Sequence, residues 1–297
     1  MAIRRGSWRF GAVPRRLGAA GTVVVMLEID VWPEVEDPVL VVAITGWVDA
    51  GSAGELAAST LVSNLDDGSS FGRYALDDLV DLQQTRPTVV LSDGTTRHIT
   101  WPHLWLDAGT AGRDVVVVRG PEPSLRWPSV SRDLVDLASR LGVVRAFTLG
   151  GMPAVVSHRR PVPVLATATA RSLAQEVGAT RTDYDGPTGM QTVLQVELGA
   201  AGIPTVGLWA QVPHYVSGNP SPPAVRAMLD RLTELGGIDV SSEELDEEIE
   251  SYAGKVEEGL ADRPDVADLV AAIESQTVEE VSGDALAAEI ERFLREQ

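Results

Sequence analysis

Six consecutive apolar residues, 39–44, lead directly into a glycine-rich stretch at residues 46–54. The apolar run is continuous and rich in β-branched side chains, which is typical of a strand buried on both faces of a parallel sheet. Helical spacing of apolar residues follows the glycines. In an open α/β sheet, the carboxyl end of a strand and the amino end of the next helix border the crevice in which ligands bind. This feature therefore predicts both a fold class and the place of a site.

The same order of strand and helix recurs along the chain as far as residue 240. Apolar, β-branched runs predict the strands, and amphipathic segments between them predict the helices. Strands are expected at residues 103–106, 115–118, 146–149, 163–166 and 204–209, and helices at residues 77–82, 126–141, 172–177, 192–201 and 222–235. Strands that alternate with helices of this length imply an α/β fold, in which a mostly parallel sheet carries helices on both faces.

Asp93 and Gly94 separate two short strand-like runs, residues 88–91 and 96–101. An Asp-Gly pair is typical of a two-residue hairpin turn, because both positions accept the positive φ that such a turn needs. A β-hairpin is therefore predicted here. Since a hairpin pairs its strands antiparallel, the sheet is expected to be mixed rather than wholly parallel.

Composition divides the chain into three parts. Residues 1–25 contain five arginines and no acidic residue, and we expect them to form a disordered basic extension. Such an extension would arise if the start site is assigned too early and Met26 is the true initiator. The alternative is a secretory signal. Residues 26–240 are expected to form the α/β core domain. Residues 241–297 contain 18 acidic and 4 basic residues, a net charge of −14 in a chain of net charge −19.

The acidic C-terminal part is expected to be a helical appendage. Three amphipathic segments follow one another with no strand between them; Ser241 with Glu244 suggests a capping box before the first, Pro264 opens the second and Asp284 precedes the third. Their narrow apolar stripes are typical of helices packed at the edge of a domain. The acidic outer faces serve either solvation or the binding of a partner.

Composition also excludes several classes of function. A net charge of −19 argues against nucleic-acid binding, which needs a basic face. The chain has no cysteine, so disulfides and thiolate metal sites are excluded and a cytoplasmic location is expected. No apolar run reaches the roughly 20 residues of a membrane span, so no membrane partner is expected.

Four loops are predicted to meet at the carboxyl edge of the sheet, where they could line one crevice. The candidate ligand-binding residues in these loops are Asp49, Gly51, Gly151, His158, Arg160, Gly186, Thr188, His214 and Tyr215. Arg160, together with Arg159, suits an anionic ligand such as a phosphate or carboxylate. No catalytic residue can be assigned among them.

Each candidate also has a purely structural explanation. The glycines lack the spacing of a dinucleotide-binding loop, and no lysine follows them as in a P-loop, so close packing of helix on strand accounts for them equally well. Asp49 either caps the helix or holds the turn. Ser52, with Glu55 three residues later, is predicted to form a capping box. His158 and His214 are either functional or structural hydrogen-bonding groups.

Metal and cofactor sites receive little support. His98 and His103 flank Trp101-Pro102 without the spacing of a zinc site, so no metal is predicted. Ser52 does not stand in the G-x-S-x-G pattern of a nucleophile elbow. No cofactor is predicted either.

Several motifs taken in order resemble the proteasome-assembly-chaperone-2 family, in its actinobacterial branch. The motifs are TGWVDAGSAG at residues 45–54, LGGMP at 149–153, HRRPVPV at 158–164, YDGPTGM at 184–190, GIP at 202–204 and PHYV at 213–216. Any one of them is weak, whereas the ordered set, spread over residues 39–240, is fairly specific.

The resemblance implies an α/β core similar to nucleoside-phosphorylase-like folds and self-association into homo-oligomers, trimers among them. Eukaryotic and archaeal members include chaperones that dock on proteasome α subunits, partly through a C-terminal tail of a hydrophobic residue, a tyrosine and any residue. This chain ends Arg295-Glu296-Gln297, so that way of docking is not carried over. The acidic helices take the place of the tail.

Two functions follow. The leading hypothesis is a non-enzymatic, self-associating cytoplasmic protein linked to proteasome assembly or regulation, with proteasome subunits as partners. The alternative is an enzyme or small-molecule binder that holds an anionic or nucleotide-like ligand in the strand-end crevice. Side chains that converge on an open pocket with shifted pKa values would favour the alternative. Side chains that are buried and paired with backbone would favour the first.

Overall fold

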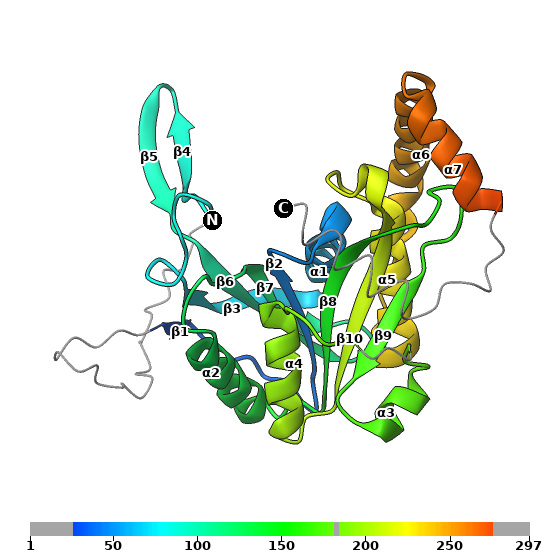
Figure 1. The fold of residues 1–297 in the computed structure, drawn as a ribbon. Helices are drawn as coiled ribbons and strands as arrows, with labels where there is room; N and C mark the ends of the chain where they lie inside the picture. The colour runs from blue at the N-terminus through cyan, green and yellow to red at the C-terminus, as the bar shows by residue number, and fades with distance from the viewer. Residues whose placement is uncertain (1–25, 181–183, 276–297) are drawn as a thin grey trace, which may run out of the picture.

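The computed structural model describes residues 26–180 and 184–275, which form an α/β unit around one eight-stranded sheet (Figure 1). The strands of this sheet are β1 (Leu27–Ile29), β2 (Val39–Thr45), β3 (Asp66–Ala75), β6 (His103–Thr110), β7 (Asp114–Pro121), β8 (Arg145–Ala154), β9 (Val164–Ala168) and β10 (Thr205–Pro213). The helices are α1 (Ala53–Ser63), α2 (Trp127–Arg140), α3 (Arg171–Glu176), α4 (Met190–Ala200), α5 (Pro222–Gly236), α6 (Asp246–Ala261) and α7 (Pro264–Ser275). Short 3₁₀ turns are η1 (Ala50–Ser52), η2 (His214–Val216) and η3 (Glu243–Leu245).

The strand order is β1-β3-β6-β7-β2-β8-β10-β9. The four central strands β7, β2, β8 and β10 are parallel, whereas every pair outside them is antiparallel. The predicted mixed sheet is confirmed, with its parallel pairing confined to the centre. Because the carboxyl ends of these four strands lie at one edge, the loops that follow them are brought together there.

Helices cover both faces of the sheet, as predicted. The alternation of β2 shows how: Val39, Val41 and Ala43 pack with α1 and α5, whereas Leu40, Val42 and Ile44 pack with α2 and α4. Successive side chains of a strand point to opposite faces, so a continuous apolar run is what a strand covered on both sides requires. Figure 1 shows α2 and α4 on one face and α1 and α5 on the other.

The predicted hairpin is confirmed as a separate two-stranded ribbon, β4 (Thr88–Ser92) and β5 (Thr95–Thr100). Asp93 and Gly94 both have positive φ, 52° and 70°, as a tight hairpin turn requires. The ribbon lies between β3 and β6 in the sequence and projects away from the eight-stranded sheet (Figure 1).

The helix predicted at residues 77–82 is wrong, because the chain makes isolated turns there. The amides of Leu79 and Val80 both bond to the carbonyl of Leu76, which closes a single turn. The carbonyl of Leu79 accepts from Ser124 and Leu125 of a distant segment. Since that carbonyl is already engaged from outside, it does not serve as the acceptor that would continue a helix.

The first two predicted C-terminal helices are confirmed as α6 and α7, which pack on each other through Val256, Leu260, Val266 and Val270. The capping box at Ser241 and Glu244 is wrong: a 3₁₀ turn intervenes, and Ser241 Oγ accepts from the amide of Glu243 at 3.5 Å. Leu245 is buried in the main core, so the start of this segment is joined to the core domain. The predicted extension at residues 1–25 and the third helix lie outside the described residues.

Candidate functional site

The glycine-rich turn after β2 is built around the carboxylate of Asp49. Asp49 Oδ1 accepts from the amide of Gly54 at 2.8 Å, and Oδ2 accepts from that of Glu55 at 3.3 Å, so Asp49 caps α1. The prediction that Ser52 caps this helix is wrong. Gly51 and Ser52 both have positive φ, and with this backbone Ser52 makes no side-chain cap bond while Asp49 reaches the free amides.

Close backbone packing explains the glycines of this turn and of β8. A Cβ atom on Gly151 would lie 2.1 Å from the carbonyl oxygen of Ala50, and one on Gly54 would lie 2.5 Å from that of Leu149. The amide of Gly51 donates to Ser217 at 2.8 Å, which joins the turn to the segment after β10. The candidates Asp49, Gly51 and Gly151 are therefore brought together, with Asp49 and Gly151 forming a β-bridge.

Two half-buried carboxylates face helix N-termini at this edge of the sheet. Burial raises the pKa of Asp49 to about 6, although its bonds to the amides of Gly54 and Glu55 oppose the shift. Glu122 follows β7, and its Oε1 accepts from the amide of Met190 at 2.6 Å, at the start of α4. Burial also raises the pKa of Glu122. Sequence reasoning missed Glu122, whose signal was its place directly after a predicted strand.

His158, in the loop after β8, is held on both sides of its ring. Its side chain is 1% exposed, and its backbone amide donates to Tyr215 Oη at 3.0 Å. Nδ1 lies 2.8 Å from the same hydroxyl, and Nε2 lies 3.1 Å from Glu257 Oε1. Because Tyr215 Oη accepts from the amide of His158, we assign the Tyr215 hydroxyl as the donor to His158 Nδ1. Nε2 then carries the ring proton and donates it to Glu257.

Helices α6 and α7 provide acceptors for the two arginines that follow His158. Arg159 donates from Nε and Nη2 to the two carboxylate oxygens of Glu257 at 2.6 and 2.9 Å, and from Nη1 to Glu274 at 3.0 Å. Arg160 Nη2 donates to the carbonyl oxygen of Glu274 at 2.6 Å. Hydrogen bonds from Arg159 lower the pKa of Glu257 to about 2 and also lower that of Glu274. The anionic groups that Arg159 binds are therefore part of the chain itself.

Glu257 and Glu274 were missed by sequence reasoning. They are two of many acidic residues in the C-terminal part, and nothing in their spacing separates them from solvated neighbours. Their role depends on how α6 and α7 fold back over the loop, which is a tertiary feature.

Of the remaining candidates, His214 adjoins this cluster through Tyr215, whereas Gly186 and Thr188 lie apart from it. His214 Nδ1 is 3.2 Å from the carbonyl oxygen of Ala154, and its ring packs edge-on against Tyr215. Gly186 and Thr188 lie in an exposed loop before α4, on the side of Glu122. The predicted site residues thus fall into a capped glycine turn, a basic loop closed by acidic helices, and a separate exposed loop.

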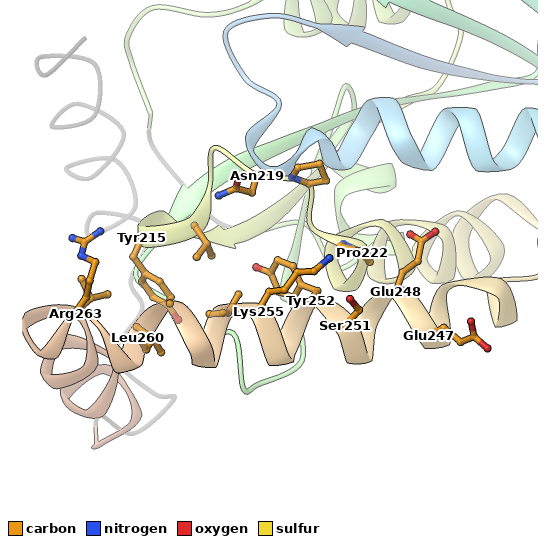
Figure 2. Close-up of a pocket in the computed structure, with 15 residues that line it drawn as sticks. Tyr215, Asn219, Pro222, Glu247, Glu248, Ser251, Tyr252, Lys255, Leu260 and Arg263 are labelled. Atoms are coloured by element: carbon orange, nitrogen blue, oxygen red, sulfur yellow. The ribbon is translucent and has the colours of Figure 1, made fainter.

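A groove lies beside the basic loop, between the segment after β10 and helices α6 and α7 (Figure 2). This groove has a volume of about 840 Å³. Its lining residues are Tyr215, Val216, Asn219, Pro220, Pro222, Glu247, Glu248, Ser251, Tyr252, Lys255, Val256, Gly259, Leu260, Arg263 and Val266. Most of its wall is apolar, and its charged side chains stand along α6 and the start of α7.

Two further searches cover the described part of the chain only. Within residues 26–180 and 184–275, no three His, Asp or Glu side chains are arranged to hold a metal ion. Over the same residues, no helix is long and apolar enough to cross a membrane.

The family profile of the PAC2 family matches residues 43–260, which include every motif described above. The chain belongs to the PAC2 family. This PAC2 protein shares 40% identity with a PAC2 family protein from Streptomyces avermitilis, over 79% of this chain and all of the other, with a TM-score of 0.72. The resemblance inferred from the motifs is confirmed.

Two other solved structures extend the comparison. A proteasome-assembly chaperone homologue from Mycobacterium tuberculosis is 34% identical over 78% of this PAC2 protein and 99% of its own length, with a TM-score of 0.72. An archaeal proteasome activator from Pyrococcus furiosus is 17% identical over 78% and 97% of the two chains, with a TM-score of 0.64, and shows the shared fold. No protein of curated function matches the sequence significantly.

Proposed function

We propose that this PAC2 protein is a non-enzymatic, self-associating protein of the cytoplasm that acts in proteasome assembly or regulation. One observation carries the choice over a small-molecule binder: the carboxylates of Glu257 and Glu274 occupy the guanidinium group of Arg159 in the strand-end loop. An anionic ligand would have to displace both carboxylates from Arg159. The 34% identical relative described as a proteasome-assembly chaperone homologue supports the link to the proteasome.

The surface proposed to meet the proteasome is the outer, acidic side of α6. Glu250 and Glu258 are exposed and lie two helical turns apart, so they share a face outside the groove. Neither makes an ion pair in the described part of the chain. Such a face attracts a basic partner surface and speeds its association. Proteasome α subunits that present a basic patch are the expected partners.

The test is co-purification of the full-length protein with proteasome α subunits of its host organism, followed by assembly of proteasome particles on native gels. The variant Glu250→Gln/Glu258→Gln is expected to lower α-subunit capture at least threefold. Asp77→Asn/Asp78→Asn removes the same charge from exposed positions far along the chain and serves as the control. Failure of the wild-type protein to capture α subunits or to change their assembly would refute the proteasome proposal.

A further inference from the structure

Within the described part of the chain, the β4–β5 hairpin has an apolar face that is exposed. Val89 pairs with Ile99 across the two strands, and Leu91 lies two residues beyond Val89, so the three side chains share a face. They are 48%, 50% and 64% exposed, in the order Val89, Ile99 and Leu91. Trp101, just past the end of β5, is also half exposed.

A two-stranded ribbon of this kind is marginally stable by itself in water and gains stability when a hydrophobic face is covered. Exposed apolar residues that gather on one face of a projecting element mark an interaction site. The hairpin carries Asp93 and Arg97 as its acidic and basic residues, so it is close to neutral in a strongly acidic protein. Two copies of the chain can therefore meet at the hairpin without the repulsion expected elsewhere.

The groove along α6 is matched to the hairpin in length. From Glu247 to Leu260, α6 contributes about 20 Å of groove wall at roughly 1.5 Å per residue. The six residues of β5, Thr95–Thr100, extend over about 17–20 Å at roughly 3.4 Å per residue. Most of the groove wall is apolar, with the ring of Tyr252 near Pro222 and that of Tyr215 near Leu260 (Figure 2). An apolar ribbon fits such a surface.

The charges are also complementary. Glu248 and Lys255 stand on the groove side of α6 about 10 Å apart, seven residues along the helix. In the hairpin, Asp93 at the tip and Arg97 on β5 are separated by a similar distance of about 10 Å. Placing Asp93 at Lys255 brings Arg97 to Glu248. Lys255 is the only lysine in the chain and forms no ion pair within the described residues.

The hairpin of a molecule does not reach its own groove. It leaves the sheet between β3 and β6, whereas the groove follows β10, four strand positions or about 19 Å beyond β6. Figure 1 shows the hairpin and the α6–α7 pair extending in the same direction from opposite ends of the molecule. The hairpin therefore fits the groove of a second copy.

We propose that the β4–β5 hairpin of one copy docks, apolar face inward, in the α6 groove of the next copy. This inference rests on the self-association proposed above and names its two surfaces. Because the surfaces are different, the contact is heterologous and runs head to tail, which generates a closed ring when the rotation between copies closes.

Two glycines of α6 provide a matched test in the full-length protein. Gly259 lines the groove and Gly254 does not, and a Cβ atom added at either meets no described atom within 4 Å. Neither substitution is strained, and both replace glycine within a helix. Gly259→Trp fills the groove and is expected to weaken self-association at least tenfold, as measured by analytical ultracentrifugation. Gly254→Trp is expected to leave it unchanged.

The possible results separate this inference from the function proposed above. A wild-type protein that is monomeric at high concentration would refute self-association and this inference together. A wild-type oligomer that Gly259→Trp leaves intact, or that both variants weaken equally, would refute the hairpin-in-groove contact alone. Capture of proteasome α subunits is a separate measurement, made with the Glu250→Gln/Glu258→Gln variant.

Cross-linking tests the direction of the contact. Since the chain has no cysteine, only introduced thiols can form a disulfide. In the arrangement with Asp93 at Lys255, Leu91 lies near Ser251, which lines the groove. We expect a mixture of a Leu91→Cys chain and a differently tagged Ser251→Cys chain to form mixed disulfide dimers on oxidation. Leu91→Cys chains that cross-link to one another instead would show that hairpins pack face to face, and would overturn the proposal. Absence of any cross-link would overturn it as well.

Discussion

Two neighbouring loops at the carboxyl edge of the sheet are held by opposite means. The glycine turn after β2 is fixed by backbone contacts, and a single added Cβ at Gly151 or Gly54 would collide with a carbonyl oxygen. The loop after β8 is fixed by side chains that reach it from far along the chain, 98 residues away for Arg159 and Glu257. The glycine turn is therefore expected to be sensitive to added side-chain volume, and the loop after β8 to the removal of charged side chains.

This difference separates two kinds of motif at the carboxyl edge of the sheet. The glycine turn is a structural joint of the first strand–helix unit, since its one ionisable group, Asp49, caps α1. The basic loop is a docking surface for the helices α6 and α7. In both arrangements the central charged group bonds to other parts of the chain, Asp49 to the amides of Gly54 and Glu55 and Arg159 to Glu257 and Glu274, although both loops carry the residue types of a binding site.

The largest effect is expected from volume added at Gly151. Gly151→Ala places a methyl group 2.1 Å from the carbonyl oxygen of Ala50, and the backbone on both sides is fixed by the β-bridge. We expect a loss of about 3 kcal/mol in the free energy of unfolding, measured by urea denaturation. Gly218→Ala is the control, because nothing lies within 4 Å of its added atom. Equal losses in both variants would show that the turn is not tightly packed.

A smaller effect is expected from charge removed at the basic loop. Arg159→Gln and Glu257→Gln, combined in a double-mutant cycle, should show a coupling free energy of about 1 kcal/mol, since both side chains are 44% exposed. The coupling should fall when salt is raised from low to molar concentration. The exposed pair of Arg73 and Glu28 is the comparison. A coupling no larger than in that pair would mean that the geometry at Arg159 adds nothing.

The two loops should respond to pH with opposite signs. Because the pKa of Asp49 is raised to about 6 from 3.8, the folded state binds its proton more tightly, and stability should fall as pH rises through this range. Asp49→Asn keeps the capping oxygen and should flatten the pH dependence of the melting temperature between about 4 and 6. An unchanged pH profile in the variant would contradict the buried position of this carboxylate.

The smallest effect concerns Glu257. Its pKa is lowered to about 2 from 4.5, so its contribution is present above about pH 4.5 and is lost as pH falls towards 2. Hydrogen exchange of α6 and α7 should speed up over this acidic range in the wild type. In Glu257→Gln the exchange of these helices should be faster already at neutral pH and should change less with acid. The same acid response in both proteins would assign the effect to other carboxylates.

Local patterns were sufficient to predict most of the fold. The β-branched run at residues 39–44 predicted β2, and Asp93-Gly94 predicted the hairpin turn. The capping box predicted at Ser52 was wrong, because a capping-box pattern does not reveal the positive φ of two successive residues, Gly51 and Ser52. The site was harder to predict: His158 and Arg159 were identified, but their partners Glu257 and Glu274 come from helices whose placement depends on long-range packing.

The central claim is that charged contacts of the basic loop hold α6 and α7 in place. Hydrogen–deuterium exchange of the full-length wild type and Arg159→Gln at neutral pH and low salt tests it most directly. We predict that amides of α6 and α7 exchange about five times faster in the variant, which corresponds to about 1 kcal/mol, whereas those of β2 and α1 keep their rates. Unchanged exchange of α6 and α7 would contradict the claim.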